Sequence, residues 1–132
     1  MIAAAGTAEG VYLVDVGTEQ LVGFEAEARL EPAGLDVELP RLVAATVSGS
    51  TVVAVLDRRP PLAVSHDAGR TWREAGGGLP PGSAVAIASD NPDVIVYGAR
   101  NRLYLSRDGG RFWRSLAPEL PEIEALELRG DT

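Results

Sequence analysis

The chain has 132 residues, a length that suits one small domain with a single core. It carries 19 acidic and 12 basic residues, and its net charge of −7 argues against a nucleic-acid partner, because a phosphate-binding footprint needs a basic surface. The absence of cysteine excludes disulfides, thiolate metal sites and cysteine nucleophiles.

Short apolar runs separated by Gly, Pro, Asp and Asn predict an all-β fold. None of these runs approaches the roughly 18 apolar residues that a membrane span needs. Met1–Ala5 is too short an apolar start for a signal peptide and lacks a basic head. We therefore expect a cytoplasmic protein with no membrane partner.

The first predicted repeat, residues 1–40, begins with the strand Ile2–Gly6 and the loop 7–9. Tyr12 and Leu13 match Tyr104 and Leu105 at a shift of 92 residues. Two valines, at 14 and 16, then stand where the later repeats have polar turn residues. Roughly ten extra residues around Phe24–Leu35 set this repeat apart from the others.

The second repeat, residues 41–81, begins after the pair Leu39-Pro40 with the predicted innermost strand Leu42–Val47. A hairpin loop then holds Arg58 and Arg59. A turn motif follows, and its characteristic residues are Ser65, Asp67, Gly69, Thr71 and Trp72.

The third repeat, residues 82–122, has the innermost strand Ala84–Ala88, a predicted turn at 90–93 and the strand Val94–Gly98. Its hairpin loop is Arg100-Asn101-Arg102. The turn motif then returns 41 residues after its first copy, as Ser106, Asp108, Gly110, Phe112 and Trp113.

Both motifs have the chemistry of a hairpin turn. Ser and Asp side chains accept hydrogen bonds from nearby backbone amides, and Gly supplies a positive φ. The Trp that follows is expected to return the chain to an apolar layer. The form Ser-x-Asp-x-Gly-x-Thr-Trp resembles the Asp-box, or BNR, repeat of sialidases, sortilin-type receptors and photosystem II assembly factors. The resemblance implies a β-propeller of four-stranded antiparallel blades, with the motif residues structural and not catalytic.

The last segment, residues 123–132, contains a further innermost strand, Ile123–Leu128, and the first repeat lacks one. Three blades per chain do not close a propeller, which has about four to eight. We therefore predict a six-bladed ring formed by a homodimer, in which 123–132 completes the first blade of a partner chain. Two alternatives are that the chain is a fragment of a longer propeller and that another protein supplies the missing blades.

The candidate ligand-binding residues are the hairpin arginines Arg58, Arg59, Arg100 and Arg102. A homodimer would display them around one mouth of the ring, where they suit a small anionic ligand. The alternative is that these arginines pair with neighbouring carboxylates at the surface.

Other features suggest little chemistry. His66 is expected at the surface, residues 76–78 as a flexible loop, and Glu124 and Glu127 on a wet strand face or in the channel. No metal-ligand spacing and no cofactor motif is recognisable.

The leading hypothesis is a non-catalytic platform for protein interaction or assembly, with an unknown protein partner. The alternatives are a binder of small anions and a sialidase-like glycoside hydrolase. The hydrolase would need an arginine triad, a tyrosine nucleophile with a glutamate partner and an acid/base carboxylate. Tyr12, Tyr97 and Tyr104 lie instead in strands with core-like alternation.

Overall fold

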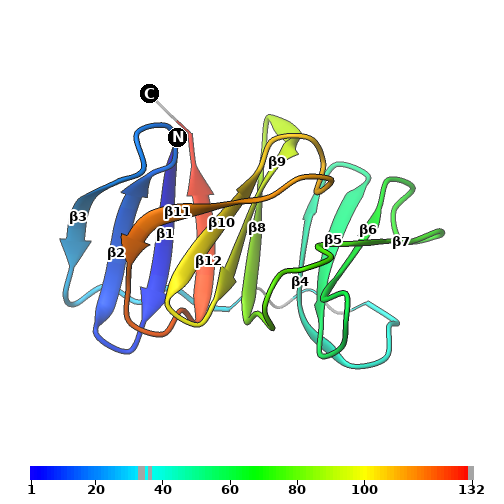
Figure 1. Cartoon of the computed structure of the whole chain (residues 1–132), viewed down its shortest axis with the longest axis horizontal. Helices are drawn as coiled ribbons and strands as arrows, with labels where there is room; N and C mark the ends of the chain where they lie inside the picture. The colour runs from blue at the N-terminus through cyan, green and yellow to red at the C-terminus, as the bar shows by residue number, and fades with distance from the viewer. Residues whose placement is uncertain (33–34, 36, 131–132) are drawn as a thin grey trace.

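The computed structural model describes residues 1–32, 35 and 37–130. All regular structure in these residues is β, as three four-stranded antiparallel sheets, and the described part contains no helix long and apolar enough to cross a membrane. The all-β prediction is confirmed. Figure 1 shows the three sheets standing side by side along the long axis.

Sheets B and C are meanders of consecutive strands, and sheet A is a meander of the first three strands with the last strand of the chain added at its edge. Sheet A has the order β12-β1-β2-β3, formed by β12 (Ala125–Arg129), β1 (Ile2–Thr7), β2 (Gly10–Asp15) and β3 (Gln20–Glu25). Sheet B is formed by β4 (Leu42–Ser48), β5 (Thr51–Leu56), β6 (Leu62–Ser65) and β7 (Arg73–Ala75). Sheet C is formed by β8 (Ala84–Ala88), β9 (Asn91–Ala99), β10 (Arg102–Ser106) and β11 (Arg114–Glu119).

Most predicted strands lie within a residue or two of their expected bounds, and two differ. The segment 90–93 was expected as a turn, but β9 begins at Asn91, which pairs with Ala88 across a β-bulge. The Asn91 side chain also accepts a hydrogen bond from the amide of Asp93 (3.1 Å). The last strand begins at Ala125, because the amide of Ile123 is already bonded to the carbonyl of Arg100.

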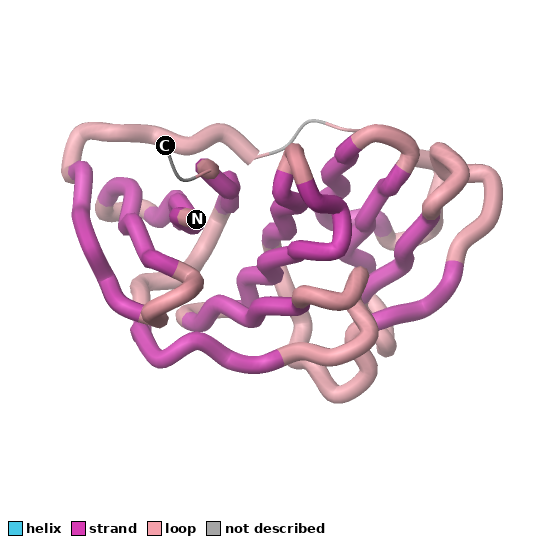
Figure 2. Tube along the Cα trace, turned by 90° about the horizontal axis from the view of Figure 1, so that it is seen from above, coloured by secondary structure: helices cyan, strands magenta, loops and turns pink. Residues whose placement is uncertain are grey.

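Sheet C lies between the other two, and the sheets spread like a fan from their innermost strands (Figure 2). One apolar core fills the space between sheets A and C and includes Ala5, Val14, Leu105 and Leu116. A second core fills the space between sheets B and C. Alternate residues of one strand enter opposite cores, as the two-residue period of a strand requires.

The innermost strand of sheet A comes from the far end of the sequence. β12 pairs antiparallel with β1, with Gly6 opposite Ala125 and Ile2 opposite Arg129. The predicted pairing segments are therefore the ones that meet, although we expected them to come from two chains. In this structure they belong to one chain, because the short connection 120–124 sets β12 beside β8 and sheet A packs there.

The connection from β3 to β4, residues 26–41, joins the two sheets at opposite ends of the fan. Its residues Leu35, Val37 and Leu39 pack on the face of sheet B that points away from sheet C. Phe24, expected among the extra residues, belongs to β3 instead. The connection thus covers part of an otherwise open sheet face.

Candidate functional site

The first turn motif is a network of hydrogen bonds around one carboxylate. Asp67 Oδ1 accepts bonds from the amides of Thr71 (2.8 Å) and Arg70 (3.1 Å) and from the Ser65 hydroxyl (2.7 Å). The Thr71 hydroxyl donates to Oδ2 (2.6 Å), and Ser65 Oγ accepts the amide of Gly69 (2.8 Å). These bonds, led by those of Thr71, hold the pKa of Asp67 well below its usual range.

The second turn motif repeats the network with one bond fewer. Asp108 Oδ1 accepts bonds from the amides of Phe112 (3.0 Å) and Arg111 (3.1 Å) and from Ser106 (2.8 Å). Phe112 has no hydroxyl to donate, and the residue is 79% exposed. The pKa of Asp108 is also lowered, chiefly by the Phe112 amide. Both motifs therefore have the geometry of structural turns.

The glycine and tryptophan of each motif also occupy matching places. Gly69 and Gly110 adopt φ values of 89° and 92°, which disfavour any residue with a Cβ. We expected both tryptophans in an apolar layer between sheets, and both are half-buried. Trp113 joins the core between sheets B and C, whereas Trp72 joins the small cluster on the outer face of sheet B.

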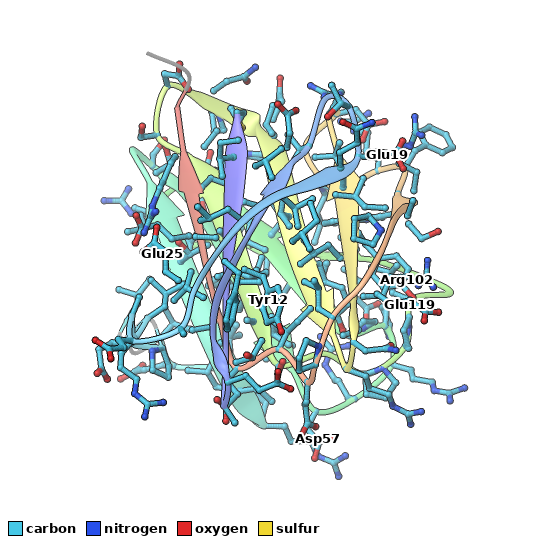
Figure 3. The ribbon with its side chains drawn as sticks, turned by 90° about the vertical axis from the view of Figure 1, so that its left-hand side faces the viewer. Tyr12, Glu19, Glu25, Asp57, Arg102 and Glu119 are labelled. Carbon is cyan, nitrogen blue, oxygen red and sulfur yellow. The ribbon has the colours of Figure 1, made fainter. Side chains whose placement is uncertain are left out.

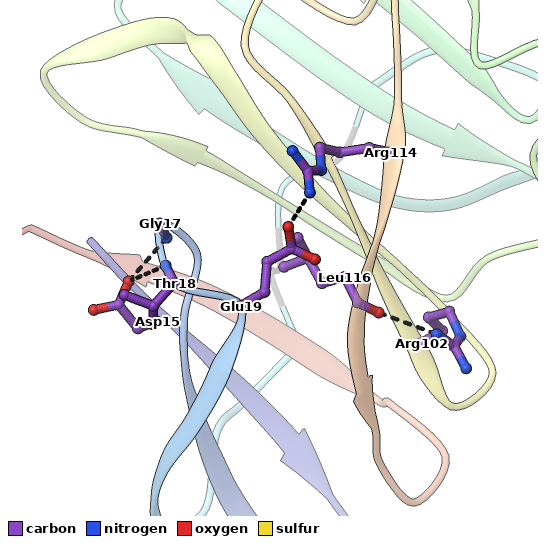
Figure 4. Close-up of polar contacts among 7 residues, drawn as sticks. All are labelled: Asp15, Gly17, Thr18, Glu19, Arg102, Arg114 and Leu116. Carbon is purple, nitrogen blue, oxygen red and sulfur yellow. Dashed lines mark hydrogen bonds and ion pairs between the residues drawn. The ribbon is translucent and has the colours of Figure 1, made fainter.

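Sheet A has a simpler turn that the sequence analysis missed. The Asp15 carboxylate accepts bonds from the amides of Gly17 (2.8 Å) and Thr18 (3.1 Å), which lower its pKa (Figure 4). The signal was the local sequence Asp-Val-Gly-Thr, in which Asp15 precedes a glycine by two residues. Nearby, Glu19 forms an ion pair with Arg114 of sheet C.

Two of the four candidate arginines are neutralised by carboxylates. Arg58 lies 2.7 Å from a carboxylate oxygen of Glu74, and Arg102 lies 2.8 Å from one of Glu119. Arg102 also donates to the carbonyl of Leu116 (3.1 Å), and Figure 3 shows Arg102 and Glu119 side by side. For these two residues the structure matches the alternative of paired surface arginines.

The other two candidates, Arg59 and Arg100, line one hollow of about 560 Å³. Arg59 comes from the β5–β6 hairpin of sheet B and Arg100 from the β9–β10 hairpin of sheet C. Pro60 and Pro61 of the β5–β6 hairpin line it too, and the connection 76–83 supplies the remaining wall, including Gly77 and Gly78, which the sequence indicated only as a flexible loop. Within the described residues, neither guanidinium has an ion pair or a side-chain hydrogen bond.

The remaining candidates stay apart from this hollow. His66 is exposed and its Nδ1 lies 3.3 Å from the Thr51 hydroxyl. Glu124 and Glu127 are exposed, and Glu127 accepts a bond from Arg129 (3.2 Å). Over the described part of the chain, no group of three or more His, Asp or Glu side chains gathers to hold a metal ion.

The tyrosines differ in their surroundings. Tyr97 is fully buried, its hydroxyl donates to the carbonyl of Pro80 (2.6 Å), and burial raises its pKa. The Tyr12 hydroxyl donates to the carboxylate of Glu9 (3.1 Å). The pKa of Tyr12 is raised, mainly by partial burial and secondly by the Glu9 carboxylate. Tyr104 packs against Tyr97 with 6.2 Å between ring centroids.

Comparison of the chain with protein-family models, with curated proteins and with solved structures finds no match. The assignment of function therefore depends on the geometry of the chain itself.

Proposed function

We propose that the protein is a non-catalytic assembly module, a three-bladed segment of a BNR-type β-propeller that forms a six-bladed ring with a second copy of itself. One observation carries this proposal. Within the described chain, the outer faces of sheets A and B pack against no other sheet, whereas the corresponding faces of sheet C, in the middle of the fan, both do.

The outer face of sheet B is the first of these ends. Trp72 and Trp113 hold the same position in the two turn motifs. Trp113 lies on the face of sheet C that packs against sheet B. The equivalent face of sheet B is its outer face, which carries Trp72 and has none of the described sheets packed on it. It is covered instead by a few side chains of the connection 26–41. On β4, Val43 and Val47 remain 47% and 50% exposed.

The outer face of sheet A is the second end. Leu13 matches Leu105, which lies in the core between sheets A and C. Leu13 alternates with Tyr12 and Val14, which point into that core, so it lies on the opposite face of sheet A. On β3, Leu21, Val22 and Phe24 are exposed. In a ring of two chains, the outer face of each sheet A would pack on the outer face of a sheet B.

Strand exchange completes this arrangement. In the ring we propose, β12 of each chain pairs with β1 of the other, with the register seen here within one chain. The connection 26–41 then joins neighbouring sheets, as 76–83 does between sheets B and C. Exchange of an identical element between copies requires no new pairing and is a low-cost route to a dimer.

The hydrolase alternative lacks support in the tyrosine environments. Tyr12 has a carboxylate partner in Glu9 (3.1 Å), as a tyrosine nucleophile needs, but neither residue lines the hollow that holds Arg59 and Arg100. The Tyr97 hydroxyl is also bonded to a carbonyl and buried.

Light scattering of the intact chain over a range of concentrations tests the ring. We expect twice the chain mass of 13.8 kDa. A monomer at every concentration contradicts the proposal. The double variant Val43→Glu/Val47→Glu should be a folded monomer, because it places charges on two side chains that are exposed in the single chain and that closure of the ring would bury. Phe112→Glu is the matched control, since Phe112 is exposed on a turn, and it should remain a dimer.

A further inference from the structure

We infer that the hollow lined by Arg59 and Arg100 is a binding site for a small organic anion that carries a phosphate or carboxylate group. The hollow lies between two sheets of one chain, so this site does not depend on the proposed ring. Its volume of about 560 Å³ falls within the usual range of small-molecule sites, roughly 300–1,000 Å³.

The charges of the hollow are uncompensated. The neighbouring arginines, Arg58 and Arg102, each have a carboxylate within hydrogen-bonding distance, whereas Arg59 and Arg100 have none among the described residues. Other arginines, among them Arg70 and Arg111, also lack a carboxylate partner among the described residues, and Arg59 and Arg100 differ from these two in sharing one concave surface. An oxyanion supplies the missing counter-charge, and the planar guanidinium suits its oxygens.

The backbone places arginine where turn chemistry does not favour it. Arg100 adopts φ 56°, in the left-handed region that glycine and asparagine prefer in two-residue hairpins. The hairpin is Ala99-Arg100-Asn101-Arg102, so arginine occupies the strained position although asparagine is its neighbour. Glu19, Arg41 and Ala68 also adopt φ values of 59°, 62° and 61°, so this conformation directs the hairpin and acquires weight only together with the position of Arg100 at the hollow.

Main-chain donors are also available on the same wall. Gly77 and Gly78 line the hollow, and within the described chain their amides donate no hydrogen bond. Gly78 has φ 88°, and successive free amides with such geometry are common in anion sites. Pro60, Leu79 and Pro80 supply apolar wall for the organic part of a ligand.

A titration of the ¹⁵N-labelled chain with inorganic phosphate tests the site. We expect saturable chemical-shift changes at the amides of Gly77 and Gly78 that sodium chloride at equal ionic strength does not cause. Succinate in a parallel titration distinguishes the sources, because a carboxylate site responds to succinate and a phosphate site to phosphate. Arg59→Gln/Arg100→Gln should weaken the binding roughly tenfold or more, through loss of charge-assisted hydrogen bonds.

The matched control is Arg70→Gln/Arg111→Gln, which removes two exposed arginines from the turn motifs and should bind like the parent chain. Both double variants are expected to keep the parent spectrum away from the hollow, since all four side chains are exposed. The inference is overturned if neither anion gives a saturable change, or if the change survives in Arg59→Gln/Arg100→Gln. Chemical shifts report anion binding whether the chain is a monomer or a dimer. A negative result would therefore count against the anion site and not against the proposed ring.

Discussion

The hydroxyl of Tyr97 donates a hydrogen bond to the main-chain carbonyl of Pro80, at 2.6 Å. Tyr97 lies on β9 of sheet C, and Pro80 belongs to the connection arriving from sheet B. The bond therefore fixes the segment that forms one wall of the arginine hollow. It also satisfies the only polar atom of a fully buried side chain, which would be costly to leave unpaired.

Gly82→Ala should destabilise the fold through this tyrosine. A Cβ at Gly82 would overlap the ring and hydroxyl of Tyr97, which is buried and has little room to move. We expect a loss of about 1–3 kcal/mol in the free energy of unfolding, measured by urea denaturation. Gly130→Ala is the control, since nothing lies within 4 Å of its new Cβ. Equal stability of the two variants would contradict the close packing described here.

The two motif tryptophans should differ in their contribution to stability. Trp113→Ala removes a ring that packs against Tyr97, with 6.1 Å between centroids, in the core between sheets B and C. We expect it to lower the free energy of unfolding by about 3 kcal/mol. Trp72→Ala should cost roughly half as much at concentrations where the chain is monomeric, because its cluster consists mainly of alanines and connection side chains. If Trp72→Ala lowered the free energy of unfolding more than Trp113→Ala, the conclusion that Trp113 is the more stabilising of the two would be wrong.

The motif carboxylates should make stability depend on pH in the acid range. The pKa values of Asp67 and Asp108 are lowered in the folded chain. Their stabilisation is therefore complete above the unfolded value of about 3.9 and is lost as the pH falls toward the folded values. Melting temperatures measured from pH 7 to pH 2 should fall less steeply below about pH 4 in Asp67→Asn than in the parent chain.

The two motifs provide an internal comparison for that effect. The Thr71 hydroxyl bonds to Asp67, and Phe112 offers no such bond to Asp108. In NMR titrations we expect Asp67 to have the lower pKa, and Thr71→Val to raise it toward that of Asp108. If the two carboxylates titrated at the same pH in the parent chain, the Thr71 hydroxyl would not be what lowers the pKa of Asp67 further.

Shortening the connection between β3 and β4 should force strand exchange. Deletion of residues 28–35 leaves a connection as long as 76–83, which joins neighbouring sheets. We expect a connection of that length to join neighbouring sheets and not sheets A and B at opposite ends of one fan, so a folded chain should be a dimer. Light scattering and circular dichroism check the result. A folded monomer, or loss of the fold, would contradict the exchanged ring.

Much of the fold could be predicted because the repeat and the strand period both leave clear signals. Leu42–Val47 and Ala84–Ala88 alternate between two faces, and the turn motifs mark the hairpins that follow. Whether β12 pairs with β1 of its own chain could not be predicted, because that depends on the reach of the connection 26–41 and on the order of the sheets in space.

The candidate site was only partly predictable for a similar reason. The four arginines share two hairpin loops, so the sequence grouped them correctly by loop. Whether each guanidinium is neutralised depends on carboxylates from other strands, since Glu74 of β7 pairs with Arg58 and Glu119 of β11 pairs with Arg102. The glycines 77 and 78 were recognisable as a loop, but their place beside Arg59 and Arg100 arises from packing between two sheets.

The pairing of β1 with β12 has a consequence for the order of folding. Sheets B and C are each built from consecutive strands, so their contacts are local and close short loops. Sheet A instead needs contacts between segments separated by nearly the whole chain, which carry the largest loop-closure entropy. We therefore expect sheets B and C to assemble first and to provide the surface on which β12 is held. Until then β1 keeps an open edge, and in that interval it is free to accept the corresponding strand of another molecule.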